Sequence, residues 1–284
     1  MLVLLTAALL APTGARAASD SSNDGDAPQV KLVDPGAEPR TALRVTAPVG
    51  STTNSTMTMS IETSQRIGGH AMGSPVSGNA STGMQSTVTS IDADGNRRVE
   101  VHYSSPTVPD LAGVRMTATM TPVGAFEDVS FEVPSTASAA TQSLVSQLEG
   151  QASNLSVPYP EAPVGVGAHW VVTQHPKLNG IKVTQRIDYR LTERRGDQLV
   201  FDVSTQQTAP RARVRLPGIP SGAQVRITRW LVKGRGTSAV DPAHVMPLDS
   251  NLSTKGVQLF ALQQGADHEV MRLTISMDMH VTSS

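Results

Sequence analysis

Residues 271–282 read MRLTISMDMHVT, and this stretch decides the fold. Apolar side chains occupy every odd position from Met271 to Val281, and polar side chains occupy every even position from Arg272 to Thr282. Successive side chains of a β-strand point to opposite faces, so the alternation predicts a strand with one face on a core and the other in water. Half-buried strands of this kind are typical of antiparallel sheets.

The same period of two recurs along most of the chain. It is clearest over residues 56–63, 98–103, 114–120, 129–133, 181–191 and 199–203. Asp94-Gly95 and Gly196-Asp197 stand between such segments, and hairpin turns favour these residues because they tolerate positive φ. We therefore predict an all-β, mainly antiparallel fold, built as a curved sheet or an open β-barrel.

One stretch has the spacing of a helix. Residues 135–150 carry an apolar stripe made of Ala140, Leu144, Val145 and Leu148. Ser135 is a candidate N-cap and Gly150 a candidate stop. The pattern predicts one central amphipathic helix of about three to four turns, packed on the concave side of the sheet.

The two parts of the chain on either side of this stretch are alike. The similar segments are VRMTATMTPVG at 114–124 with VRITRWLVKG at 225–234, and SIDADGNRRVEVHY at 90–103 with RLTERRGDQLVFDV at 190–203. This similarity predicts two related β halves, 42–134 and 151–284, joined by the helix. They could be separate domains or two parts of one sheet.

The chain begins with a segment typical of export. Residues 2–11 read LVLLTAALLA, and Ala15-Arg16-Ala17 fits the small-x-small rule for signal-peptide cleavage. We therefore predict a signal peptide over 1–17, cleaved near Ala17, and a periplasmic or extracellular protein. A buried N-terminal helix is the alternative. No later segment reaches the ~20 apolar residues of a membrane-spanning helix, so no transmembrane segment is expected.

We predict that residues 18–41 form a disordered acidic tether, because the residues at the start of this segment are small or acidic and cannot bury apolar area. Within it, Val30, Leu32 and Val33 could form a short edge strand before Asp34-Pro35-Gly36 turns the chain.

Composition excludes several classes of protein. The 284 residues include 23 Lys plus Arg and 24 Asp plus Glu, and this balance argues against nucleic acid as a partner. The chain has no Cys, so disulfides, thiolate metal sites, a Cys nucleophile and a lipid on an N-terminal Cys are excluded.

Patterns that look like metal or catalytic sites are better explained by the fold. Asp92-x-Asp94-Gly95-Asn96 resembles the start of a calcium loop, but Tyr103 stands at the twelfth position, where such a loop has Glu. Asp278 and His280 share the polar face of the last strand, where surface side chains are expected. No G-x-S-x-G motif occurs. We therefore expect no enzymatic activity, no metal and no cofactor.

Methionine is frequent on the predicted inner faces, whereas aromatic residues make up 3% of the chain. Met side chains are flexible and polarisable, and they are common on surfaces that fit varied apolar ligands. A concave sheet lined with them would suit a lipid-like molecule, and ordinary core filling is the alternative. The candidate ligand-binding residues are Met57, Met59, Met116, Met120, Met277 and Met279.

A basic segment runs from Val203 to Val240, where no acidic residue occurs. The segment predicts a docking surface for an anionic partner, such as a lipid headgroup, an envelope polymer or an acidic protein. A solvated edge kept charged to prevent strand pairing is the alternative. The candidate residues are Arg211, Arg213, Arg215, Arg226 and Arg229.

Several segments carry a family resemblance. They are LVDPGAEPR at 32–40 with Leu43-Arg44, Met57-Thr58-Met59, Pro158-Tyr159-Pro160, and PVGVGAHW at 163–170. In these the chain resembles a group of exported bacterial proteins catalogued only as a domain of unknown function. The resemblance covers most of the chain after the predicted signal peptide and implies an envelope or secreted location and a β-rich fold, but no reaction. Many such proteins look like lipoproteins with a Cys after the signal, and this chain departs from that pattern.

Together these patterns predict an exported, non-enzymatic envelope protein that binds a hydrophobic or lipid-like ligand in a concavity of the sheet. The arginine-rich segment would lie at the rim of that concavity. The alternative is a structural or interaction module with a solid core and no ligand.

Overall fold

One antiparallel sheet forms the body of the protein in the computed structural model, which describes residues 27–284 except 107, 139–140, 143–144, 146–155, 179–180, 216–223 and 265–266. The predicted signal peptide, 1–17, lies outside the described residues. From edge to edge, the main path of the sheet follows β1 (Gln29–Asp34), β8 (His169–Gln174), β11 (Thr184–Arg195), β12 (Gln198–Thr208), β14 (Gln224–Val240), β15 (Asp249–Gln264), β16 (Asp267–Ser283), β2 (Thr52–Ile67), β4 (Val76–Ile91), β5 (Arg97–Ser104), β6 (Arg115–Met120) and β7 (Phe126–Glu132).

Shorter elements complete the fold. β3 (His70–Ala71) pairs with β2, and β13 (Arg213–Val214) pairs with β14. β9 (Lys177–Leu178) and β10 (Ile181–Lys182) form a separate two-stranded sheet, and Pro109–Gly113 form a 3-10 helix, η1.

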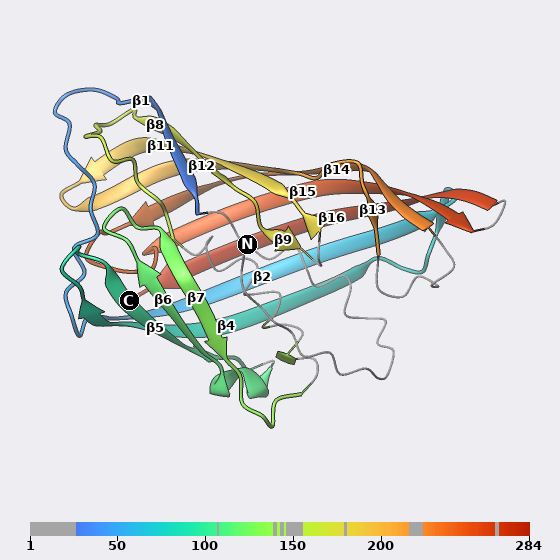
Figure 1. Ribbon diagram of the computed structural model, residues 1–284, viewed down its shortest axis with the longest axis horizontal. Helices are drawn as coiled ribbons and strands as arrows, with labels where there is room; N and C mark the ends of the chain where they lie inside the picture. The colour runs from blue at the N-terminus through green and yellow to red at the C-terminus, as the bar shows by residue number, and fades with distance from the viewer. Residues whose placement is uncertain are drawn as a thin grey trace.

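The sheet is curved and open, which confirms the predicted all-β, mainly antiparallel class. Among the described strands, β1 pairs only with β8 and β7 pairs only with β6, so the two edges do not meet. β1, β8, β11 and β12 curve over one side of the molecule, and β5, β6 and β7 curve over the other (Figure 1). The two halves therefore form one sheet, which is joined where β16 pairs with β2.

Five strands, β2, β4, β14, β15 and β16, have 16 or 17 residues each and run the length of the molecule. At about 3.3 Å per residue they span roughly 50 Å. We call the end at which β2 reaches Ile67 and β16 begins the distal end; it is the tapered end at the right of Figure 1. The opposite end is the proximal end.

The alternation in 271–282 is realised as predicted. Met271, Ile275 and Met277 are buried on the inner face of β16, while Arg272 and Asp278 are exposed on the outer face. The hairpin turns also lie where they were predicted, with positive φ at Gly95 and Gly196.

The inner face holds two main core clusters. The first, at the proximal end, is centred on Trp170, which stacks on Tyr189 at 5.7 Å and meets the edge of Phe201 at 5.4 Å. The second, toward the distal end, contains Trp230 and Phe260 in an edge contact at 6.4 Å. The β9–β10 pair adds buried side chains to this second cluster.

The predicted central helix is not borne out. Of residues 135–150, those described with helical geometry are Thr141, Gln142 and Val145, and most of the others lie outside the described residues. The cap is also displaced, since Ser138 Oγ and not Ser135 accepts a hydrogen bond from a helical N–H, that of Thr141, at 3.3 Å. The Ser138 side chain bonds to nearby backbone in this way, as Ser side chains do at caps and turns.

The predicted tether is ordered over its second part, while 18–26 lie outside the described residues. Val30 and Leu32 of β1 pack against the first cluster, which offsets the entropy cost of ordering this segment. After β1, Gly36 adopts a φ of +76°, and a Cβ there would lie 2.4 Å from the Gly165 carbonyl oxygen. The turn after β1 therefore packs directly on residues 163–170, so two of the segments that carry the family resemblance are in contact.

We predict that the Trp170 cluster is central to stability. Trp170 is fully buried, and its Nε1 donates to the Pro158 carbonyl at 2.9 Å. Trp170→Ala should lower the free energy of unfolding by about 3–5 kcal/mol, measured by urea unfolding followed by circular dichroism. Val33→Ala, at a side chain 54% exposed, serves as the control and should change it by less than about 0.5 kcal/mol. Equal unfolding midpoints for the two variants would contradict this account of the core.

Candidate functional site: an apolar cavity on the inner face of the sheet

A cavity of about 100 Å³ lies on the inner face of the sheet, where the core clusters meet. Its walls come from β2, β4, β11, β12, β14, β15 and β16, together with Ser156, Val157, Met246 and Pro247 from outside the sheet. Ile187 and Tyr189 belong to the first cluster, and Val232 and Met277 to the second. The cavity is therefore an interruption of the core between its two main parts.

Small side chains at one level of the sheet explain this interruption. Strand pairing places Thr205 of β12, Gly234 of β14 and Thr254 of β15 in one row. Gly234 cannot be larger without displacing its neighbours, because a Cβ would lie 2.6 Å from Thr254 Cγ2 and 2.8 Å from Thr205 Cγ2. Larger side chains, such as Phe201 and Phe260, fill the core at other levels of the same strands.

Methionine is the most frequent residue type in the lining. Five of the eleven methionines of the chain contribute: Met57, Met84, Met246, Met277 and Met279. Met57 is inward-facing but only partly buried, since its side chain faces the cavity. A wall of unbranched thioether side chains can change shape at little cost.

The other predicted methionines lie elsewhere in the core. Met59 is buried in the second cluster beside Ile61. Met116 and Met120 are buried in the first cluster, and the Tyr103 hydroxyl donates to Met116 Sδ at 3.5 Å. The structure therefore gathers Met57, Met277 and Met279 around the cavity and leaves the remaining three in packed surroundings.

Part of the lining was not predicted from the sequence. Met84 lies on β4, where the alternation is weak, and Met246 lies in the loop between β14 and β15. Gln185 and Gln207 are opposite one another on β11 and β12, and both break the apolar alternation on the inner face. Polar residues at two inward positions of neighbouring strands are a signal that would have indicated this site.

Polar atoms in the lining are incompletely paired. Three of them have no hydrogen-bond partner among the described residues: Ser156 Oγ, Gln207 Oε1 and Ser238 Oγ. The amide nitrogen of Gln207 donates to Gln185 Oε1 at 2.7 Å, but the Oε1 atom of Gln207 itself accepts no hydrogen bond from a described residue. A buried polar group without a partner costs about 1–3 kcal/mol, so a bound molecule with a hydroxyl or amide would be stabilised here.

The described lining carries no charged side chain. Burial raises the pKa of the Tyr189 phenol, so this group stays neutral. An ion would lose its hydration without gaining a partner, and the cavity therefore favours neutral molecules.

The predicted arginine segment does not form the rim of this cavity, because none of its members lines it. Arg213 lies on β13 directly opposite Arg226 of β14, and Arg229 lies further along β14. These three and the neighbouring Arg211 and Arg215 are exposed. These arginines lie on the outer face at the distal end, whereas the cavity lies on the inner face.

The described residues contain no group of three or more His, Asp or Glu side chains that could hold a metal ion. No helix among them combines the length and the apolar character needed to cross a bilayer.

No family model and no curated protein matches the chain. Among solved structures, the chain is similar to a deltaS2 mutant of the TodX monoaromatic hydrocarbon channel, with 9% identity over 83% of this chain and 91% of that chain. The TM-score is 0.19, and at that value the similarity supports no conclusion about fold or function.

Filling the cavity should not disturb the fold. Thr254→Leu adds apolar volume where space exists, so the free energy of unfolding should stay equal or rise. In a fully packed core the same change would cost about 1–3 kcal/mol. Ala118→Leu, at a fully buried position of the first cluster, is the matched control and should show that loss in urea unfolding. Equal losses for the two variants would mean that no usable cavity exists.

Proposed function

We propose that the protein binds a small apolar molecule, or one apolar arm of a larger amphiphile, in the cavity on the inner face of its sheet. The single observation that carries this proposal is the lining of five methionines around an uncharged cavity of about 100 Å³. Well-packed interiors contain few spaces larger than a water molecule, so a cavity of this size between two core clusters is unusual, and it opens toward the exposed Asn251.

The volume limits the ligand. Sites for drug-sized molecules enclose about 300–1,000 Å³, which is well above the present volume. An engineered apolar cavity of about 150 Å³ binds benzene, so the space suits one ring or a short alkyl chain. Rotation of the methionine side chains would admit a somewhat larger group.

The unpaired polar atoms add a second preference. Gln207 Oε1 can accept a hydrogen bond, and the hydroxyls of Ser156 and Ser238 can donate or accept one. A ligand with one hydroxyl or amide beside its apolar part would therefore bind better than a pure hydrocarbon of the same size.

We further propose that the protein is an exported, non-enzymatic envelope protein. The apolar core of the predicted signal peptide and the family resemblance support export. The lining of thioether, aliphatic, amide and hydroxyl groups suits binding better than acid–base catalysis, because it contains no Asp, Glu, His or Lys side chain to transfer a proton.

Ligand binding can be tested by thermal unfolding with a series of neutral probes, from benzene to butylbenzene and from butanol to octanol. A ligand of the native state raises Tm as its concentration exceeds Kd, and the best-fitting member should raise Tm by several degrees. Each alcohol should raise Tm more than the alkane of the same chain length. Mass spectrometry of organic extracts of the purified protein would then identify a natural ligand.

Matched variants make this test specific. Thr254→Leu, which fills the cavity, should abolish the Tm shift, whereas Thr58→Leu, at an exposed outward position of β2, should retain it. The absence of a shift with every probe, or equal shifts for both variants, would refute ligand binding and favour a structural module with a solid core.

A further inference from the structure

Three pairs of like-charged residues face each other across neighbouring strands, two at the distal end and one near the middle of the long strands. They are Arg213 with Arg226, Lys233 with Lys255, and Arg66 with Arg272. No other directly opposed pair in the described main sheet carries two like charges from Lys, Arg, Asp or Glu. Like charges directly opposite one another destabilise a sheet, so this arrangement costs stability.

All six side chains point to the outer face. Each is exposed and lies next in sequence to an inward-facing residue, as Arg272 follows Met271 and Lys233 follows Val232. Arg229 is exposed on the same face of β14, beside the two distal pairs, whereas Lys233, Lys255 and Arg235 lie further toward the proximal end. We call Arg66, Arg213, Arg226, Arg229 and Arg272 the distal cationic face.

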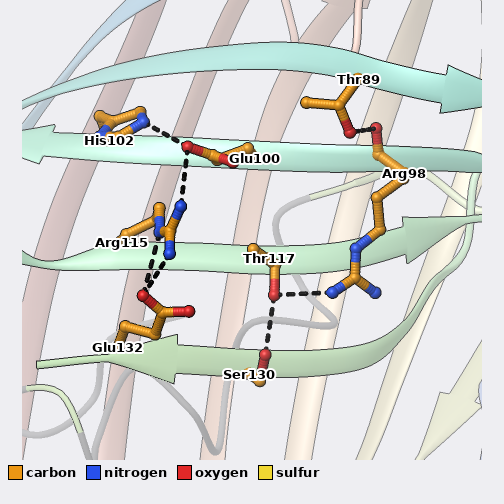
Figure 2. A network of polar contacts seen from close by, with 8 residues as sticks. All are labelled: Thr89, Arg98, Glu100, His102, Arg115, Thr117, Ser130 and Glu132. Atoms are coloured by element: carbon orange, nitrogen blue, oxygen red, sulfur yellow. Dashed lines mark hydrogen bonds and ion pairs between the residues drawn. The ribbon is translucent and has the colours of Figure 1, made fainter.

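The distal cationic face lacks counter-ions within the described protein. None of its members forms an ion pair there, although Glu62 and Asp278 lie on the same face. The outer face of β5, β6 and β7 differs, as Figure 2 shows, because Arg115 there lies between Glu100, at 3.5 Å, and Glu132. The protein therefore pairs its arginines on one part of the outer face and leaves them unpaired on another.

Apolar side chains lie between the cations. Strand pairing forms a row in which Leu259 is flanked by Arg229 and Arg272. The next row toward the proximal end holds Leu231 and Val257, which face outward and are only partly buried. These two rows and the Lys233–Lys255 pair border a shallow hollow in the outer surface.

The distal end also exposes large apolar side chains. Met72 is 55% exposed and Val270 53%. The Val270 carbonyl accepts a hydrogen bond from Gly68 N–H at 3.1 Å, and Met72 N–H donates to the Gln65 carbonyl at 2.9 Å, so both flank the end of β2 beside Arg66. Exposed apolar groups next to a basic face are typical of proteins that bind at a membrane interface.

We propose that the distal end docks on the surface of an anionic lipid bilayer. The distal cationic face lies against phosphate headgroups, and Met72 and Val270 enter the boundary between headgroups and acyl chains. Headgroup anions would separate the like-charged pairs and remove their repulsion. A soluble polyanion would satisfy the arginines but would leave the exposed apolar side chains without a role, so the membrane is the better match. This inference does not depend on the proposed ligand.

Vesicle co-sedimentation tests this proposal with the full chain. Binding to vesicles of phosphatidylglycerol and phosphatidylcholine (3:7) should be strong at low salt, weaken as salt rises, and be far weaker on pure phosphatidylcholine. Each basic residue near such a surface contributes about fivefold in affinity, so Arg66→Gln/Arg272→Gln should bind about 30-fold more weakly. The same variant should be as stable as wild type or more so, because a repulsive pair is removed. Arg98→Gln/Arg190→Gln removes two exposed arginines away from the distal end and should bind as wild type does.

A second variant distinguishes binding to a membrane from binding to a soluble polyanion. Met72→Ser/Val270→Ser should weaken binding to the anionic vesicles at least severalfold while leaving retention on a heparin column unchanged. Vesicle binding equal to that of wild type would overturn membrane docking in favour of a polyanion. Equal binding by the two arginine double variants would show that the distal cationic face is not the contact surface.

Discussion

The pairing of β16 with β2 is the constraint on which the remaining structure depends. It runs from Met271 opposite Ile67 to Ser283 opposite Ser55, and it joins the two halves of the chain into one sheet. Its register sets Met277 beside Ile61 and so turns both apolar faces inward. A slip of one residue would turn the whole apolar set of β16 to the outer face, so the alternation of residues 271–282 fixes one register strongly.

This register also determines where the core can be filled. Each row across the sheet combines residues that are far apart in sequence. The summed volume of their inward side chains decides whether the core is filled at that level. The aromatic cluster of Trp170, Tyr189 and Phe201 fills the proximal level, whereas Thr205, Gly234 and Thr254 coincide at the level of the cavity. The cavity is therefore a property of the row and not of any single strand.

This difference explains what the sequence predicts and what it does not. Period two is local, so strands and hairpin turns could be predicted, and so could the inward direction of Met57, Met277 and Met279. Composition alone is misleading over residues 65–83, which are rich in Ser and Gly, because β2 reaches Ile67 and β4 begins at Val76, where pairing to neighbouring strands holds these residues. The coincidence of Gln185 with Gln207, and the contribution of Met246 from a loop, depend on partners that no local pattern identifies.

The outer face follows from the same constraint. Once the apolar residues of β14, β15, β16 and β2 are turned inward, every intervening residue must face outward, and the register then decides which of them become neighbours. The basic segment of β14 is visible in the sequence, but the pairs of Arg66 with Arg272 and Lys233 with Lys255 arise only from the pairing of distant strands. A chain with a net charge of -1 thus collects five arginines on the outer face of its distal end, and none of them forms an ion pair with a described residue. Neutral substitutions at these outward positions would keep the inward pattern intact, so the fold itself does not require this concentration of charge.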